Sequence, residues 1–427
     1  MFVTHAFQLP FEKELYEELR NMQRETATVW NDIVREATSY YFTWKKWLSK
    51  SEIQAVRKQT YNLHSQTVQA IADKYEANRE TIRKLRKTDK KAKYPWRRKY
   101  YYCIPLKKAS MEITDIIIKI KRVNYEVSLV DLLTKKKKKN WNESIAKKNN
   151  AVSIPNLAID DVKDCNYAEI VWRNGAYWFC YSVAVSEKDI SQYKKKVAGG
   201  DLGEIHAVTV ATKDKALLVS GRAIRSISQF RAKALADLSK KMSRCKKGSR
   251  QWKKYKTARN RIRQKSKNQM EQLEHKTTKE VVQFLEQEQV THFVIGNVSG
   301  IEKNTKQNVK KKQKNNKKRR QQLSLWNQGK IKQKLTYKAK LKGIKVEETE
   351  ESYTSQDCPF CGGRHKANGR RFICSVHKTE IHRDLNGAQN IARKLHEMGV
   401  QPIVSVVHKQ PVWYKRFLKK SIACRMA

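Results

Sequence analysis

The chain has 427 residues, with 92 lysines and arginines against 41 aspartates and glutamates, and a formal net charge of +51 at pH 7. Hydrophobic residues make up 39% of it, which is enough for folded cores, so the composition excludes a wholly disordered basic tail. The length fits two or three compact units. A charge this large repels itself unless a polyanion neutralises it, so nucleic acid is the expected partner, with an anionic membrane as the alternative.

The membrane alternative finds no support in the sequence. No stretch approaches the ~20 apolar residues that a spanning helix needs, and residues 1–5 lack the basic and apolar regions of a signal peptide. Five of the eight cysteines are scattered and three cluster near the C-terminus, which does not suit a disulfide framework. We therefore expect a reducing compartment and a local metal site.

The N-terminal half begins with a strand followed by helices. Residues 1–10 read as a short strand ending at Pro10, and apolar residues recur at helical spacing from Phe11 to about Lys90. Aromatic and cationic side chains alternate at residues 40–47. Two interpretations of these aromatic rings stay open, namely core packing in a helical bundle and stacking on bases.

Strand patterns follow from about residue 94 to residue 190. Residues 116–121 end in a strand-like alternation, and residues 168–185 read as two strands about the turn Asn174-Gly175. The five consecutive lysines at 135–139 are typical of a solvated loop. Residues 1–10 and 94–190 are therefore predicted to form one β-rich basic unit, into which the helical residues 11–93 are inserted.

A second unit begins near residue 196 and alternates strands with helices. Residues 301–320 are extremely basic, and taken alone they predict a segment that stays solvated until nucleic acid orders it. The predicted strands are 196–201, 207–212, 292–297 and 345–347, and the predicted helices are 227–288, with a turn at Gly248, and 326–342, ended by Gly343.

A cysteine–histidine cluster is the clearest local signal. Cys358 and Cys361 form one C-x-x-C pair, and Cys374 and His377 form a C-x-x-H pair after a spacer of twelve residues. This spacing fits a zinc ribbon with three thiolates and one imidazole as tetrahedral ligands. Four protein ligands leave no open position for water, so the predicted zinc is structural.

Two aspartates stand out because acids are scarce in this chain. Asp201 follows the apolar residues 197–200, and Asp384 lies at the start of a predicted helix that runs to Lys394. Carboxylates from distant segments can hold two Mg²⁺ ions that hydrolyse a phosphodiester. The structural alternatives are a turn aspartate at Asp201 and a helix N-cap at Asp384.

In this order, the motifs resemble the TnpB (OrfB) proteins of insertion sequences, which are related to the compact type V CRISPR effectors. The resemblance spans about residues 199–395, and its most specific block is 351–391. It is carried by residues 200–203 (Gly-Asp-Leu-Gly), 293–301, 337–339 (Tyr-Lys-Ala), 351–356, the two zinc-ligand pairs, and 382–391, which begin His-Arg-Asp-Leu-Asn-Gly-Ala.

The resemblance implies an α/β plus β architecture. A RuvC-like nuclease domain of the RNase H fold, with inserted helices and a zinc ribbon, would follow a β-barrel wedge domain that contains an inserted helical recognition domain. The expected bounds are 1–10 and 94–190 for the wedge, 11–93 for the recognition domain, 191–355 and 380–427 for the nuclease domain, and 356–379 for the ribbon.

The resemblance also implies an RNA-guided DNA endonuclease that binds a guide RNA and target double-stranded DNA. Asp201 and Asp384 match the family's first and last catalytic aspartates, which hold two Mg²⁺ ions. Many relatives have Glu-Asp after the central strand, whereas this chain has Gly296-Asn297. Glu351 is therefore expected to supply the missing carboxylate. Glu347, Glu348 and Glu350 are its rivals for this role. A solvated acidic face is the structural alternative for all four glutamates.

Two other functions stay open at this point. A nuclease-inactive, RNA-guided DNA-binding repressor would explain the loss of the acid pair at Gly296-Asn297, although it has no need of Asp201 or Asp384. A transposition accessory with non-specific DNA affinity is the third possibility. For all three we expect a bacterial cytoplasmic protein associated with the nucleoid, without a membrane partner.

Overall fold

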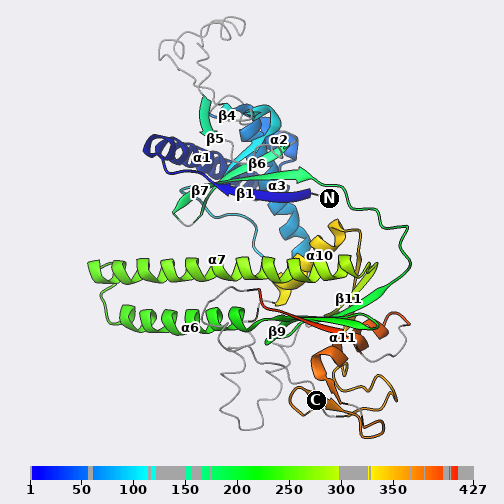
Figure 1. The fold of residues 1–427 in the computed structure, drawn as a ribbon. Helices are drawn as coiled ribbons and strands as arrows, with labels where there is room; N and C mark the ends of the chain where they lie inside the picture. The colour runs from blue at the N-terminus through cyan, green and yellow to red at the C-terminus, as the bar shows by residue number, and fades with distance from the viewer. Residues whose placement is uncertain are drawn as a thin grey trace, which may run out of the picture. The chain divides into compact units, whose positions relative to one another are not determined.

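The structure is a computed structural model, and the chain forms two compact units, Met1–Val185 and Ser186–Ala427 (Figure 1). Within the described residues, no helix is both long and apolar enough to span a membrane. The lysine run at 135–139 and the basic residues 301–320, both discussed above, lie outside the residues that the structure describes. The structure describes residues 2–55, 61–113, 117–121, 151–155, 165–173, 175–297, 326, 328–365, 368–378, 380–397, 403 and 405–411.

The first unit contains two antiparallel sheets. Gly175, with φ of +86°, lies between β6 and β7, so the hairpin predicted at this position is confirmed. Closure of the two sheets into a wedge-like barrel stays a prediction. One sheet has the order β1-β7-β6-β2, formed by Phe2–Gln8, Ala176–Ala184, Tyr167–Arg173 and Ile104–Lys107; the other joins β3 (Met111–Ile113), β4 (Ile117–Lys121) and β5 (Ala151–Pro155), and a 3₁₀ turn (Lys108–Ser110) precedes β3.

The described residues of this unit form the helices α1 (Lys13–Trp44), α2 (Lys50–Ala55) and α3 (Ser65–Leu85). They confirm the predicted helical region and share a core with the first sheet, in which Trp30 contacts Tyr75 edge-on at 5.7 Å. Among the aromatic residues at 40–47, Trp47 packs against the core, as the core interpretation expects, whereas Phe42 and Trp44 are exposed. Stacking of the exposed rings on bases stays a prediction.

The second unit is built on a six-stranded sheet of order β12-β11-β8-β9-β10-β15. β8, β9 and β10 form an antiparallel meander, while β11 and β12 run parallel to β8 on its other side, and β15 runs parallel to β10. The carboxyl ends of β8, β11 and β12 therefore lie at one edge. The strands are β8 (Val197–Asp201), β9 (His206–Ala211), β10 (Lys215–Ser220), β11 (His292–Asn297), β12 (Lys345–Glu350) and β15 (Ser405–Lys409).

Helices cover this sheet and extend from it. α6 (Arg222–Ser243) and α7 (Arg250–Gln287) lie side by side as a hairpin about Gly248, and α6 begins five residues before the predicted helix (Figure 1). α10 (Gln328–Leu341) packs on α7, and α11 (Arg383–Arg393) packs on β8 and β9. β13 (Arg371–Ile373) and β14 (Glu380–His382) form a small hairpin sheet just before α11.

α11 approaches β8 so closely that the contact requires glycine. A Cβ at Gly199 would lie 1.8 Å from the carbonyl oxygen of Ala388 in α11. A side chain at this position would push α11 off the strand, and α11 carries Asp384. The separation between sheet and helix is thus set by a missing side chain.

We expect Gly199→Ala to destabilise the second unit by about 1–3 kcal/mol, the usual cost of overpacking. Gly329→Ala in α10 is the matched control, because a Cβ there meets no atom within 4 Å. The control should be neutral, or stabilising by up to about 1 kcal/mol. Calorimetry of both variants checks this, and equal midpoints would contradict the close-contact argument.

Candidate active site

Asp201 ends β8 and lies against α11. A Cβ on Gly387, in the first turns of α11, would lie 3.5 Å from the Oδ2 atom of Asp201. Burial, with a smaller contribution from the nearby charge of Asp384, raises the pKa of Asp201 to about 7. The structure therefore brings the two predicted aspartates together, although 183 residues separate them in the chain.

Asp384 is held by three side chains. Its Oδ2 atom lies 2.7 Å from Nδ1 of His206, and the same oxygen accepts a hydrogen bond from Nη1 of Arg370. Its backbone N–H donates to Nδ1 of His382, which makes His382 the N-cap of α11 and rules out the N-cap alternative for Asp384. Burial works to raise the pKa of Asp384, but these hydrogen bonds and charges outweigh it and lower the pKa below its usual value.

Glu351 follows β12 and fills the space left by Gly296. A Cβ at Gly296 would lie 2.1 Å from Oε1 of Glu351 and 2.6 Å from its carboxyl carbon. β11 pairs Ile295 with Gly200, so the next residue of β11, Gly296, lies level with Asp201 on the neighbouring strand. The Glu351 carboxyl group therefore occupies the position where a side chain at residue 296 would begin, beside Asp201.

The electrostatics of Glu351 reflect the same placement. Burial, followed by the charge of Asp201, raises the pKa of Glu351 to about 8, while Lys332 and Lys394 oppose the rise. Its buried Oε1 atom has no hydrogen-bond partner among the described residues. A buried carboxylate oxygen without a donor is costly, and a cation would relieve that cost.

The three rival glutamates are engaged elsewhere. Glu347 pairs with Lys345 at 2.7 Å and with His396 at 2.5 Å, and Glu348 pairs with Lys332 at 2.8 Å. Glu350 accepts a hydrogen bond from the hydroxyl group of Ser352. Of the four glutamates, Glu351 is the one whose carboxyl lies against Gly296, next to Asp201.

Sequence reasoning missed the basic partners of Asp384. His206, His382 and Asp384 place their potential ligand atoms within 4.8 Å of one another, and Nη1 of Arg370 lies 3.2 Å from Nδ1 of His206. His382 is close to Asp384 in the chain and could have been noticed. His206 lies far from Asp384 in the chain, and Arg370 lies in the predicted ribbon region. Nothing in the sequence around either residue marks it as a partner of Asp384.

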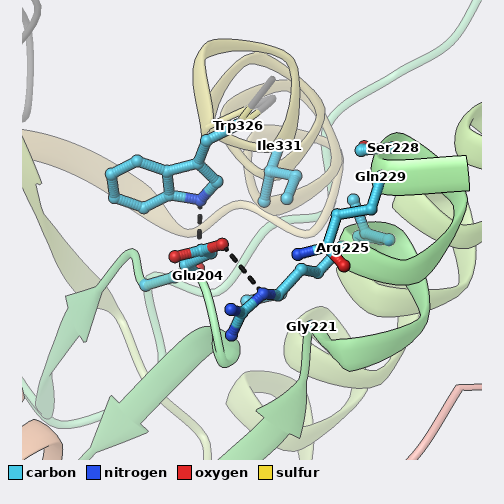
Figure 2. Close-up of a pocket in the computed structure, with 10 residues that line it drawn as sticks. Glu204, Gly221, Arg225, Ser228, Gln229, Trp326 and Ile331 are labelled. Carbon is cyan, nitrogen blue, oxygen red and sulfur yellow. Dashed lines mark hydrogen bonds and ion pairs between the residues drawn. The ribbon is translucent and has the colours of Figure 1, made fainter. Parts of the chain in front are cut away.

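The loop after Asp201 is braced by a tryptophan from a distant segment. Nε1 of Trp326 donates to the carbonyl oxygen of Gly203 at 3.1 Å, and Arg225 pairs with Glu204 at 3.1 Å. Figure 2 shows Trp326 and Arg225 converging on this loop from opposite sides of a small cavity. The cavity measures about 30 Å³, which is room for roughly one water molecule and too small for a substrate. The contacts of Trp326 and Arg225 around it brace the loop.

The predicted zinc ligands also converge. The ligand atoms of Cys358, Cys361, Cys374 and His377 all lie within 4.8 Å of one another. The His377 N–H donates to Sγ of Cys374, and this hydrogen bond is the main reason that the pKa of Cys374 falls to about 6. Three thiols and an imidazole at this range form a donor set that suits zinc.

A second histidine, which the spacing did not single out, lies at the same cluster. Nε2 of His365 is 3.7 Å from Sγ of Cys374 and 4.0 Å from Sγ of Cys361. Nδ1 of His377 is 3.5 Å from Sγ of Cys374. His365 is therefore a structural rival to His377 as the fourth ligand.

Two family models match segments of this chain. The model described as a probable transposase (OrfB_IS605) matches residues 179–302, and the Cas12f1-like TNB domain matches residues 329–391. Between them they cover Asp201, Glu351, Asp384 and all the cluster cysteines. The second segment lies within residues 199–395, which carry the resemblance, and the first overlaps them from residue 199 onward.

Known proteins give the same answer. The chain is 28% identical over 254 residues to a TnpB-like protein of Methanocaldococcus jannaschii, covering 57% of this chain and 87% of that protein. It is similar in fold to Cas12f1 solved by cryo-EM with sgRNA and target DNA, with a TM-score of 0.61 and 16% identity over 90% of this chain and 83% of that one. This chain thus shares the mixed α/β fold of that Cas12f1 chain. The resemblance recognised from the sequence is confirmed: the chain is similar in sequence to OrfB and TnpB-like proteins and in fold to a Cas12f1 effector.

Proposed function

We propose that this protein is an RNA-guided DNA endonuclease that cleaves target DNA by two-metal-ion phosphodiester hydrolysis. The observation that carries the proposal is the convergence of Asp201, Glu351 and Asp384, with a buried oxygen of Glu351 that has no donor among the described residues. Converging carboxylates in so basic a chain are hard to explain without a cation. A protein that merely binds DNA has no need of them.

The sheet supports a RuvC-like nuclease domain. Because β8 and β12 run in the same direction, Asp201 at the end of one and Glu351 just after the other meet at one edge. α11 packs on β8 and brings Asp384 to that edge from a third segment. This arrangement places the residues that match the family's catalytic acids on rigid elements of the fold.

The donor chemistry fits magnesium, since hard carboxylate oxygens are what Mg²⁺ prefers. Ions held there would activate water and stabilise the leaving oxygen of the phosphodiester. His206 and Arg370 both contact Oδ2 of Asp384, which fixes the orientation of that carboxylate. Asp201, Glu351 and Asp384 would together hold the ions.

The proposed partners are a guide RNA and target double-stranded DNA. The Cas12f1 structure that this fold resembles was solved with sgRNA and target DNA. In RNA-guided systems base pairing reads the target sequence, while the protein holds the heteroduplex by its backbone. The charge of +51 suits a chain that meets many phosphates at once. Zinc at the cysteine cluster is proposed to be structural.

The repressor alternative rests on the absent acid pair at Gly296-Asn297. The position of the Glu351 carboxyl against Gly296 weakens that argument, because a carboxylate is present where the pair would have supplied one. Tight guided binding without nicking, in Mg²⁺ or Mn²⁺, would favour the repressor. Copurification without a discrete RNA would favour a non-specific transposition accessory.

Glu351→Gln should reduce target cleavage at least about a hundredfold, as should Asp201→Ala and Asp384→Ala, because each removes a proposed metal ligand. Glu350→Gln is the matched control, one residue earlier in the chain, and should cut at close to the wild-type rate. The measurement is cleavage of target DNA by the protein with its copurified RNA in Mg²⁺. Equal rates for the Glu351→Gln and Glu350→Gln variants would remove Glu351 from the site.

Gly296→Ala should impair cleavage as strongly as Glu351→Gln, because its methyl group would displace the Glu351 carboxyl group. The two changes act on one group, so the double variant should be no worse than either single variant. Gly329→Ala serves again as the control. Additive losses in the double variant would show that residue 296 acts independently of Glu351.

Zinc content separates the two candidate histidine ligands. We expect stoichiometric zinc in the wild-type protein, a marked loss in the Cys374→Ser and His377→Ala variants, and retention in the His365→Ala variant, measured by mass spectrometry of the metal. The reverse result for the two histidine variants would assign the fourth ligand position to His365.

A further inference from the structure

A cavity of about 530 Å³ opens in the first unit, where the start of α1 meets β6 and β7. Its lining includes four aromatic rings, those of Phe11, Tyr16, Trp172 and Tyr177. Its size is typical of sites that bind small molecules or single residues of a polymer. All of its lining residues belong to the first unit, whereas the carboxylates described above belong to the second.

The aromatic rings of this cavity leave ring faces open to solvent. Phe11 contacts Tyr16 edge-on at 4.9 Å, Tyr16 contacts Trp172 edge-on at 6.0 Å, and Trp172 contacts Tyr177 edge-on at 4.7 Å. Tyr16 and Tyr177 are buried and anchor the cluster, whereas Phe11 is 77% exposed and Trp172 is 49% exposed. Edge-on packing of the buried rings thus presents two large apolar rings to a ligand.

Cations and hydrogen-bonding groups surround the rings. Arg20 donates from Nε and Nη2 to the hydroxyl oxygen of Tyr101, at 3.3 and 3.2 Å, so its guanidinium group is fixed at the cavity wall. Lys13 adds a second positive charge to the lining. Glu17 also lines the cavity and provides an acceptor for a donor group of the ligand, whereas Oε1 of Gln23 already accepts from the Tyr177 hydroxyl group at 3.2 Å.

We propose that this cavity binds an unpaired nucleotide of an RNA, with its base stacked on Trp172 and Phe11 and its phosphates beside Lys13 and Arg20. Aromatic platforms flanked by cations are how proteins bind unpaired nucleotides. Bases extruded from loops and bulges are the usual targets in RNA, and the 2′-hydroxyl group can donate to Glu17. A DNA nucleotide lacks that hydroxyl group. The site lies beyond the proposed cleavage function and does not depend on it.

The test compares RNA hairpins that differ at one position. One has a single unpaired nucleotide in its stem, offered with each of the four bases; one has an abasic residue there; and one is fully paired. Anisotropy with the full-length protein, without added Mg²⁺ and at about 0.4 M salt, suppresses the phosphate contribution that all three share. The hairpin with the unpaired base should bind roughly tenfold tighter than the other two.

Variants assign that preference to the cavity. Trp172→Ala and Phe11→Ala should each abolish it, and Phe11 is so exposed that its replacement leaves the core intact. Tyr100→Ala is the matched control, since Tyr100 is 91% exposed, adjoins Tyr101 in the chain and does not line the cavity. The control variant should retain the full preference.

Three outcomes would overturn the proposal. They are equal affinity for the bulged and paired RNAs, a preference that survives both Phe11→Ala and Trp172→Ala, and an equal preference for the same hairpins made of DNA. The Glu351→Gln variant should keep the wild-type preference. Failure of the cavity proposal and failure of the nuclease proposal would therefore be seen in different measurements.

Discussion

The repulsion between buried carboxylates is the constraint on which the second unit depends. β8, β12 and α11 bring Asp201, Glu351 and Asp384 together. Burial raises the pKa of Asp201 and of Glu351 above the values of exposed carboxyls, with a smaller contribution from the charge of Asp384 at Asp201 and from the charge of Asp201 at Glu351. Such a gathering opposes folding unless something positive compensates it. The packing of α11 on the sheet therefore has to be tight enough to hold the three acids together against this unfavourable electrostatic energy.

Missing side chains provide that tightness. At Gly199 the absent Cβ lets α11 settle on β8, and at Gly296 it makes room for the carboxyl group of Glu351. Residues 296 and 351 are thus complementary in size. The glycine on β11 leaves the space that the carboxyl group of Glu351, after β12, fills. Under the proposed function, the acid that is absent after β11 is supplied instead by Glu351, which follows the neighbouring strand β12.

Local patterns in the sequence predicted what local physics determines. The hairpin about Gly175, the turn at Gly248, the cysteine pairs and the two aspartates were all readable, because spacing and turn chemistry decide them. The choice of Glu351 over Glu347, Glu348 and Glu350 depends on how β12 is paired with β11, which the sequence does not display. β10 and the exposed edge strand β15 were missed, the latter because no face of it is buried and so no alternation marks it. The contacts of His206 and Arg370 with Asp384 join segments that are apart in the chain, and the contact of His365 with Cys374 lies in an irregular loop. Local sequence patterns do not reveal such contacts.

The compensation of charge in the proposed active site is unequal, and this inequality has a consequence. Asp384 already has two basic partners, Arg370 and His206, which hold its pKa low. Asp201 and Glu351 have raised pKa values instead: burial is the main cause for both, the charge of Asp384 adds to the rise at Asp201, and the charge of Asp201 adds to the rise at Glu351. The buried Oε1 atom of Glu351 has no donor among the described residues. A divalent cation held by Asp201 and Glu351 would therefore relieve more electrostatic cost than one held by Asp384 alone. The same cation gains less from Asp384, whose charge is partly neutralised, so that side of the site is better suited to holding geometry than to supplying affinity.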